Sequence, residues 1–433
     1  MSPNARPVTS WGRLSNEPHT VVPLRERTNI DLSRRDPHDL GLPYGNGRSY
    51  GDVCLNPGGT LWLTRGLDRF IAFDHDRGVI ECEAGVLLKD IIEVALSRGF
   101  FVPVAPGTQF ATLGGAIAND VHGKNHHRAG TFGEHVESLS LQRTDGTLID
   151  CSPVAEGELL NATIGGMGLT GLIRSARVRL KRVPGPWLDT ETLTFDRLDE
   201  FFTLSDASIA DWEYAVAWID CRGERGVFFR GNHASADSPA PRRRTRAMPV
   251  TPPVSLVNGA SLRLFNALYY RAHHARRGRR PKHYAPFFFP LDNMLEWNRM
   301  YGPRGFYQYQ CVVPRAVERD ATRELLSAIA QSGTGSFLAV LKTFGDRVSP
   351  GLLSFPMPGT TLALDFPNLG EATHALFERL NTIVLTAGGR LYPAKDACMT
   401  QELFVRGYPR LAEFLRFRDP GISSAMARRL IDA

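Results

Sequence analysis

Three glycine-rich stretches between residues 44 and 173 place the strongest constraint on this chain. They read YGNGRSYGD (44–52), VAPGTQFATLGGAIANDVHG (104–123) and ATIGGMGLTGLI (162–173). So much glycine costs conformational entropy on folding. The cost is tolerated where a ligand or another backbone must approach closely. Backbone N–H groups free of side-chain obstruction form concave sites for anions. Each stretch alone could be a surface turn, but together they indicate an extended, phosphate-bearing ligand held mostly by main chain.

The first stretch is not the dinucleotide fingerprint GxGxxG, because Tyr50 stands where the third glycine is required. No buried parallel strand precedes it either. Within it, Arg48 adds positive charge and Ser49 can donate a hydrogen bond. In the second stretch, the paired glycines 114–115 are predicted to open a short helical run over 116–119.

The spacing of apolar residues predicts an α+β fold rather than a regular strand–helix alternation. LLKDIIEVALSRG predicts a helix that ends at Gly99, and Asp145-Gly146 predicts a hairpin turn. After Pro184 the pattern predicts a second domain with an antiparallel sheet and helices near 315–331 and 370–386. Its expected strands are DWEYAVAWIDC, GVFFRGN, YQYQCVVP, SFLAVLKTFG and TTLALDFPN.

Bulk properties exclude several classes of protein. A chain of 433 residues is expected to form two domains. Its six cysteines are scattered singly, without a CxxC pair, so no zinc ribbon or dithiol is indicated. We therefore expect a reduced, cytoplasmic protein, and no apolar stretch is long enough to predict a membrane span.

Positive charge is concentrated in one segment, 239–290. Residues 241–283 hold 11 Lys+Arg and no acid, whereas the whole chain carries +6. The segment includes an amphipathic patch with arginines around it, formed by Leu262, Phe265, Leu268 and Tyr269. This pattern predicts peripheral contact with an anionic membrane or a mobile, solvated lid over the site, and the two roles are compatible. Nucleic-acid binding is not expected, because no recognition module is present.

A histidine cluster, NDVHGKNHH, spans 119–127. His122 and His126 are four residues apart, which on a helix would suit zinc. Gly123 lies between them and no HExxH glutamate accompanies them, so no metal site is predicted. His126 and His127 are expected to be structural hydrogen-bonding residues, and His122 and Lys124 to lie beside the ligand.

Five motifs then occur in a familiar order: GNGRSYGD, PGTQFATLGGAIANDVHGKNHHRAGTFGEHV, GGMGLTGLI, EWNRMYGPRGFYQYQ and YPAKD. Together they resemble the decaprenylphosphoryl-ribose 2′-oxidase family, the flavoprotein component of a 2′-epimerase. That family belongs to the vanillyl-alcohol-oxidase-type (PCMH-type) FAD-binding superfamily. The resemblance implies non-covalent FAD in a domain of residues 1–182 completed by 390–433. It also implies a substrate-binding domain, 183–389, that contains the basic segment.

The resemblance further implies a reaction. The C2′ hydroxyl of a polyprenyl-phosphoryl-β-D-ribose would be oxidised to the 2′-keto sugar, and a separate NADH-dependent keto-reductase would give the arabinose form. Two alternatives remain. One is an FAD-dependent oxidase of a soluble sugar, alditol or aldonolactone. The other is a non-catalytic membrane- or nucleic-acid-binding protein on a degenerate flavin fold. The basic amphipathic segment and the lysines disfavour the soluble-sugar oxidase.

Matching the motifs residue by residue implies two sets of site residues. The FAD-binding set is Gly45, Asn46, Gly47, Arg48, Ser49, Tyr50, Gly51, Gly107, Thr108, Gly114, Gly115, His122, Gly123, Asn125, Gly168 and Ile173. The substrate-binding set is Lys124, Trp218, Gln308, Gln310, Lys342, Thr361, Ala363 and Lys395.

The chemistry agrees with these residue types. A cation near a reduced flavin stabilises its negative charge, and Lys395 is the residue expected there. A desolvated lysine could also accept the proton, with Tyr50 or His122 as alternative bases. Gln308 and Gln310 alternate on one strand, so both amides are expected to face the sugar. Lys124 and Lys342 suit the substrate phosphate.

The chain departs from the family's best-known members on two walls of the expected pocket. Thr361 and Ala363 replace an asparagine and a cysteine, and Phe288 and Phe289 replace a tyrosine and a histidine. One wall is thus smaller and another less polar, which leaves the exact sugar open. Inhibitors that react with that cysteine are not expected to attach.

Overall fold

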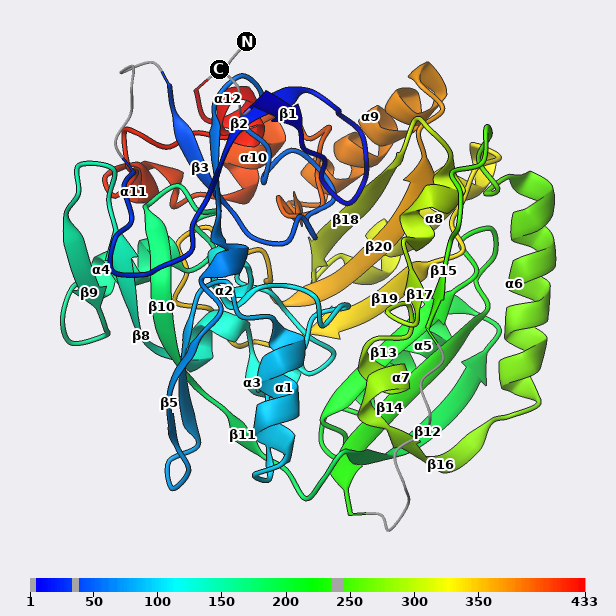
Figure 1. The fold of residues 1–433 in the computed structure, drawn as a ribbon. Helices are drawn as coiled ribbons and strands as arrows, with labels where there is room; N and C mark the ends of the chain where they lie inside the picture. The colour runs from blue at the N-terminus through cyan, green and yellow to red at the C-terminus, as the bar shows by residue number, and fades with distance from the viewer. Residues whose placement is uncertain (1–4, 33–38, 236–244, 433) are drawn as a thin grey trace.

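A computed structural model of the protein describes residues 5–32, 39–235 and 245–432 (Figure 1). In these residues the N-terminal part builds two larger sheets. The first has the order β1-β2-β4-β3 and the bounds Ala5–Pro7, Pro18–Pro23, Thr60–Leu63 and Gly41–Tyr44. The second is antiparallel, with the order β5-β6-β10-β8-β9 and the bounds Phe70–Asp74, Val79–Glu83, Leu172–Arg179, Val136–Gln142 and Leu148–Cys151.

Several predictions for this part are confirmed. The helix α1 spans Leu88–Leu96 and is followed by Gly99 at φ 77°. The hairpin β8–β9 turns at Gly146, whose φ of 90° suits glycine. The helix α2 differs: it spans Leu113–Ala118, so the paired glycines lie inside its first turn. The cause is Thr112, whose side chain caps the helix so that it begins at Leu113, three residues earlier than expected.

Shorter elements complete the N-terminal part. They are β7 (Phe100–Phe101) paired with β11 (Lys181–Arg182), α3 (His126–Ala129), α4 (Gly157–Thr163), and the 3-10 helices η1 (Thr64–Gly66) and η2 (Phe132–His135). Because α3 begins at His126, no continuous helix joins it to His122, as the intervening glycine predicted.

The predicted strands after residue 184 lie in one sheet with the order β16-β12-β14-β13-β19-β20-β18-β21 among the described residues. In that order the bounds are Gly278–His283, Trp187–Phe195, Gly226–Ala234, Tyr214–Ile219, Ala339–Phe344, Gly359–Pro367, Phe306–Pro314 and Arg390–Leu391. Alternate residues of β13, β18, β19 and β20 pack in one core with α5 (Leu198–Asp206), α8 (Glu318–Gln331) and α9 (Glu371–Thr386). The opposite face of the sheet is left to line the site.

The basic segment is structured where it is described, although residues 239–244 lie outside the described residues. It holds α6 (Gly259–His274), the edge strand β16 and α7 (Tyr284–Phe288). Two short strands, β15 (Arg246–Ala247) and β17 (Met294–Leu295), pair in parallel, and η3 spans Trp297–Tyr301. Phe265 and Tyr269 of α6 turn inward, with Tyr269 against Trp218 of β13.

The C-terminal residues form three short helices: α10 (Gln401–Gly407), α11 (Leu411–Leu415) and α12 (Ala425–Leu430). Figure 1 shows them (red) against the N-terminal part (blue). Arg429 of α12 forms ion pairs with both Asp52 and Asp396 at 2.9 Å. Strands and helices thus combine in the α+β class expected from the sequence. Within the described residues, no helix has both the length and the apolar character needed to cross a membrane.

Candidate active site

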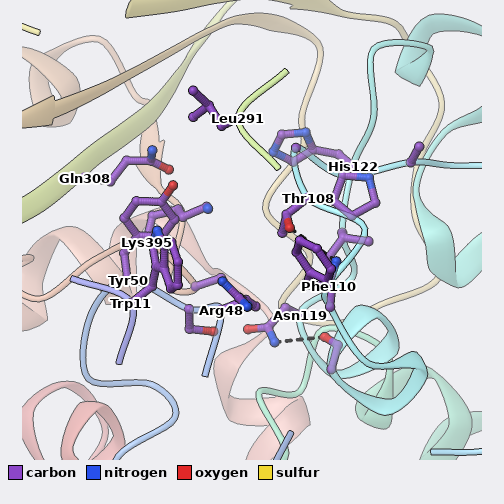
Figure 2. A pocket seen from close by; sticks show the side chains of 18 of the residues that line it. Trp11, Arg48, Tyr50, Thr108, Phe110, Asn119, His122, Leu291, Gln308 and Lys395 are labelled. Carbon is purple, nitrogen blue, oxygen red and sulfur yellow. Dashed lines mark hydrogen bonds between the residues drawn. The ribbon is translucent and has the colours of Figure 1, made fainter. Parts of the chain in front are cut away.

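A cavity of about 760 Å³ lies between the glycine-rich loops and the free face of the eight-stranded sheet. Figure 2 shows Tyr50, Lys395 and Gln308 on one side of it and Thr108, Phe110 and His122 on the other. Nearly all residues predicted from the sequence line this cavity. They are Gly45, Asn46, Gly47, Arg48, Ser49, Tyr50, Gly107, Thr108, Gly114, Gly115, His122, Gly123, Lys124, Gly168, Ile173, Trp218, Gln308, Gln310, Lys342, Thr361, Ala363 and Lys395.

Two predicted FAD-contacting residues, Gly51 and Asn125, are not among the lining residues. Gly51 packs directly on the backbone of Asp396, where a Cβ would overlap the carbonyl oxygen. Asn125 is fully buried, and its Nδ2 donates to the Pro103 carbonyl at 2.9 Å. Both residues therefore shape the walls of the cavity rather than facing into it.

The glycine-rich loops leave space where a ligand backbone or phosphate would fit. A Cβ built on Gly107 or Gly168 would meet no atom within 4 Å, because both face open space. Gly114 and Gly115 line the cavity from the first turn of α2, which Thr112 fixes by accepting a hydrogen bond from the Gly115 N–H at 3.1 Å. The main chain thus presents a cradle without side chains.

Buried polar atoms face this cradle without a partner among the described residues. The Arg48 guanidinium lies 4.2 Å from the ring of Trp11 and 5.2 Å from that of Phe110, and its Nε has no hydrogen-bond partner. The Oδ1 of Asn119 is also unpaired. Such atoms are costly unless a ligand satisfies them, and the phosphate and ring edges of a flavin dinucleotide supply acceptors and donors for both.

Lys395 is held at the end of the cavity by backbone contacts and aromatic packing. The Tyr50 N–H donates to the Ala394 carbonyl at 3.0 Å, which joins the loop 44–52 to the loop 392–396. The Lys395 ammonium then lies 3.8 Å from the centroid of the Tyr50 ring. Burial lowers the pKa of Lys395, and the charge of Asp365 opposes that lowering.

Asp365 is one residue near the site that the sequence did not predict. It is fully buried on β20, and its Oδ1 accepts a hydrogen bond from Gln308 Nε2 at 2.5 Å. Burial raises the pKa of Asp365. The available signal was its spacing, because an acid two residues after Ala363 in an apolar strand shares that residue's face.

His122 has both ring nitrogens engaged. Its Nδ1 lies 3.1 Å from the Lys342 ammonium and its Nε2 lies 2.9 Å from the side-chain amide of Gln310. Burial and the charge of Lys342 hold the pKa of His122 well below its usual value, so the ring is neutral. Because an ammonium only donates, Nδ1 accepts from Lys342, while Nε2 faces the side-chain NH2 group of Gln310.

The other two histidines of the cluster behave differently from each other. His127 Nε2 lies 2.9 Å from the Trp212 carbonyl, as expected for a structural hydrogen-bonding residue. His126 contradicts that expectation, because neither ring nitrogen has a partner among the described residues. Its ring packs 4.6 Å from that of Phe344, and burial lowers its pKa to about 3.

Of the two departures at 288 and 289, only Phe288 lines the cavity, and Phe289 is buried in the core. The Phe288 carbonyl accepts a hydrogen bond from the Lys124 ammonium at 3.0 Å. On the opposite wall, Thr361 Oγ1 accepts from Gln310 at 3.3 Å. The two substituted walls therefore flank Lys124 and Gln310.

Comparison with known proteins agrees with this geometry. The FAD binding domain family matches residues 38–152. Decaprenylphosphoryl-beta-D-ribose oxidase of Mycolicibacterium smegmatis is 38% identical over 411 residues, which cover 89% of this chain and 88% of that protein. The chain belongs to the decaprenylphosphoryl-β-D-ribose oxidase family. It is accordingly an FAD-dependent oxidoreductase.

Two relatives with lower sequence identity match smaller parts of this chain. An uncharacterized protein in the mprA 5′ region of Streptomyces coelicolor is 35% identical over 374 residues, or 80% of this chain and 100% of that protein. D-lactate dehydrogenase of Anaerostipes hadrus is 29% identical over 141 residues, or 31% of this chain and 29% of that protein.

Proposed function

We propose that this protein oxidises the C2′ hydroxyl of a polyprenyl-phosphoryl-β-D-ribose to the 2′-keto sugar. The observation that carries the proposal is the placement of Lys395, Gln308 and Gln310 in one cavity with the glycine cradle. The oxidase activity of the Mycolicibacterium smegmatis relative supports the substrate class. We assign the FAD-binding and substrate-binding roles to the residues that line the cavity.

Bound FAD would supply the oxidising power by accepting a hydride from the sugar carbon. The chain's own residues would orient the sugar and stabilise charge. Gln308 and Gln310 project from one face of β18, so their amides can hold adjacent hydroxyls. The buried Lys395 ammonium would place positive charge near the flavin ring of bound FAD, where little water would screen it.

Lys395 is also the base that burial favours. Its lowered pKa leaves part of its population as a neutral amine near neutral pH, with a free lone pair. Tyr50 is a poor base because burial raises its phenol pKa well above the usual value. His122 is neutral but has no free lone pair while Lys342 and Gln310 occupy its nitrogens.

The proposed reaction also calls for a location and a partner. Leu264 and Leu268 of α6 are 63% and 56% exposed, one turn apart, beside arginines of the basic segment. This surface supports peripheral contact at the inner face of the membrane, where a lipid-linked sugar would be presented. The 2′-keto product would then pass to an NADH-dependent keto-reductase that gives the arabinose form.

Anaerobic titration of the purified yellow protein tests the proposal. Farnesylphosphoryl ribose should bleach the flavin absorbance, whereas free ribose and gluconolactone should leave it unchanged. Bleaching by gluconolactone but not by the lipid-linked sugar would instead establish a soluble-sugar oxidase. A colourless protein that does not bind added FAD would contradict both readings.

A further inference from the structure

The cavity continues beyond Lys124 to a further lysine, Lys282, which the motifs did not identify. Lys282 lies on the edge strand β16 and lines the cavity together with His273 of α6. Its ammonium lies 5.7 Å from the centroid of Phe229, whose ring is 5.3 Å from that of His273. Lys282 is partly buried, and this burial lowers the pKa of its ammonium group.

Lys124 and Lys282 are electrostatic neighbours. Burial lowers the pKa of Lys124 to about 8, and the charge of Lys282 adds to that effect. Asp292 opposes it, but this carboxylate already accepts a hydrogen bond from the Gln109 N–H at 2.8 Å. Two desolvated cations of like charge are unfavourable until an anion lies between them.

Lys342 is less suited to that anion than the sequence suggested. Its ammonium lies 3.1 Å from His122 Nδ1 and 3.5 Å from the Gly123 carbonyl, both of which are acceptors. Its donors are therefore largely used within the protein. Lys282 has no such hydrogen bond among the described residues, which leaves its donors for a ligand.

An aromatic wall adjoins the two lysines. The rings of Trp218 and Tyr269 lie 4.7 Å apart, and those of Tyr269 and His273 lie 4.2 Å apart. The Trp218 indole N–H donates to the Phe337 carbonyl at 2.8 Å, which fixes the plane of that ring. An anion at the lysines with an apolar chain beside it matches this combination of charge and aromatic surface.

We infer that Lys124 and Lys282 together bind the phosphodiester of the substrate, and that Trp218, Phe229 and Tyr269 receive its first isoprene unit. This subsite rests on the proposed function. The chemistry is consistent, because the phosphate is attached to C1 of the ribose, next to the carbon that is oxidised. The lysine pair would thus fix which carbon faces the flavin.

The test combines binding with turnover in the FAD-loaded protein. Farnesyl phosphate, which cannot react, is titrated while the flavin spectrum and calorimetric heat are followed. In Lys282→Gln its Kd should rise at least tenfold, as expected for the loss of a charge-assisted hydrogen bond. Lys282→Arg should restore most of the affinity. Arg280→Gln, an exposed neighbour on the same strand that does not line the cavity, should change the Kd less than twofold.

Turnover should separate the phosphate from the sugar. In Lys282→Gln the KM for farnesylphosphoryl ribose should rise at least tenfold with kcat little changed, whereas the KM for uncharged octyl β-D-ribofuranoside should stay the same. An unchanged Kd for farnesyl phosphate would overturn the subsite even if the wild-type protein oxidises the lipid-linked sugar. Equal affinity for inorganic phosphate would overturn the lipid-linked assignment. If the wild-type protein oxidises no ribosyl substrate, the proposed function fails while the farnesyl phosphate titration still decides the subsite.

Discussion

Lys395 carries the largest share of the proposed chemistry at the scale of single residues. Lys395→Ala should retain FAD, because the cradle is mainly backbone, yet lose turnover by about 10²–10⁴-fold, the usual range for a missing general base. Flavin absorbance after gel filtration measures retention, and anaerobic stopped-flow reduction measures the rate. Full activity in this variant would remove Lys395 from the mechanism.

The burial of Lys342 predicts how the stability of the protein depends on pH. Burial lowers the pKa of Lys342 to about 7, against about 10.4 for an unfolded lysine. Between these two pH values the unfolded state binds more protons than the folded state, so the stability of the ligand-free protein rises with pH. Below pH 7 Lys342 is charged in both states, and the folded state carries the full cost of burying that charge. Lys342→Met should therefore stabilise the protein by about 2–4 kcal/mol at pH 6.5 and by much less at pH 10.

Urea unfolding at the two pH values measures that difference. Lys89→Met is the matched control, since Lys89 lies on the surface of α1. A stability gain for Lys342→Met that is the same at both pH values would contradict the electrostatic explanation and leave only better packing.

At this scale, the sequence could predict those site residues that lie inside recognisable motifs. Lys395, Gln308 and Gln310 stand in recognisable strings, and the cavity contains all three. Asp365 and Lys282 stand outside these strings: Asp365 had only its spacing from Ala363 as a signal, and the relevance of Lys282 arises from tertiary contacts. His126 was misjudged because its partner is an aromatic ring rather than a polar atom.

Among secondary structure elements, α2 couples a helix cap to the cofactor. Thr112→Ala removes the acceptor for the Gly115 N–H and should lower the free energy of unfolding by about 1 kcal/mol. Because Gly114 and Gly115 line the cavity, FAD affinity should fall as well.

Thr400→Ala is the control: it removes the acceptor for the Leu403 N–H at the start of α10. It should cost similar stability without changing the Kd for FAD. Equal effects of both variants on that Kd would mean that the cap acts only through global stability.

The register of β20 gives a second prediction at this scale. Ala363 pairs with Gln310 and Val340 and lines the cavity, whereas Leu362 packs on the other face. Ala363→Cys should therefore create a thiol that a methanethiosulfonate reagent labels and that bound farnesyl phosphate protects, as read by mass spectrometry. Leu362→Cys should stay unlabelled in the folded protein. The native cavity thiol, Cys54, should also resist, because burial raises its pKa to about 12.

Strands with alternating apolar residues were predictable, but β16 was not. Its sequence, GRRPKH, is polar and contains proline, which is tolerated because β16 is an edge strand paired only with β12 among the described residues. Edge strands need only one partner, so composition gives little signal for them. Lys282 is partly buried at this edge because β16 pairs with β12, and the local sequence does not favour a strand there.

At the scale of the whole molecule, sequence order conceals how the site is assembled. Loop 44–52 and loop 392–396 are more than 340 residues apart in the chain, yet the Tyr50 N–H bonds the Ala394 carbonyl, and Arg429 links Asp52 to Asp396. The predicted completion of the N-terminal part by residues 390–433 stays a prediction as a domain boundary. These contacts explain why a C-terminal lysine can stand beside an N-terminal tyrosine.

The surface of α6 leads to the last prediction, which concerns membrane contact. Leu264 and Leu268 project outward from a helix in a segment rich in arginine, so binding should need both apolar insertion and anionic lipid. The protein should sediment with vesicles that contain 30% anionic lipid and be released by 0.5 M salt. The double variant Leu264→Ser/Leu268→Ser should lose most binding while keeping its activity toward octyl β-D-ribofuranoside. Val154→Ser, which removes an apolar side chain that is 97% exposed elsewhere, should bind as the wild type does. If both variants bind equally well, this helix does not make the contact, and lipid-linked substrate must reach Lys124 and Lys282 by another face.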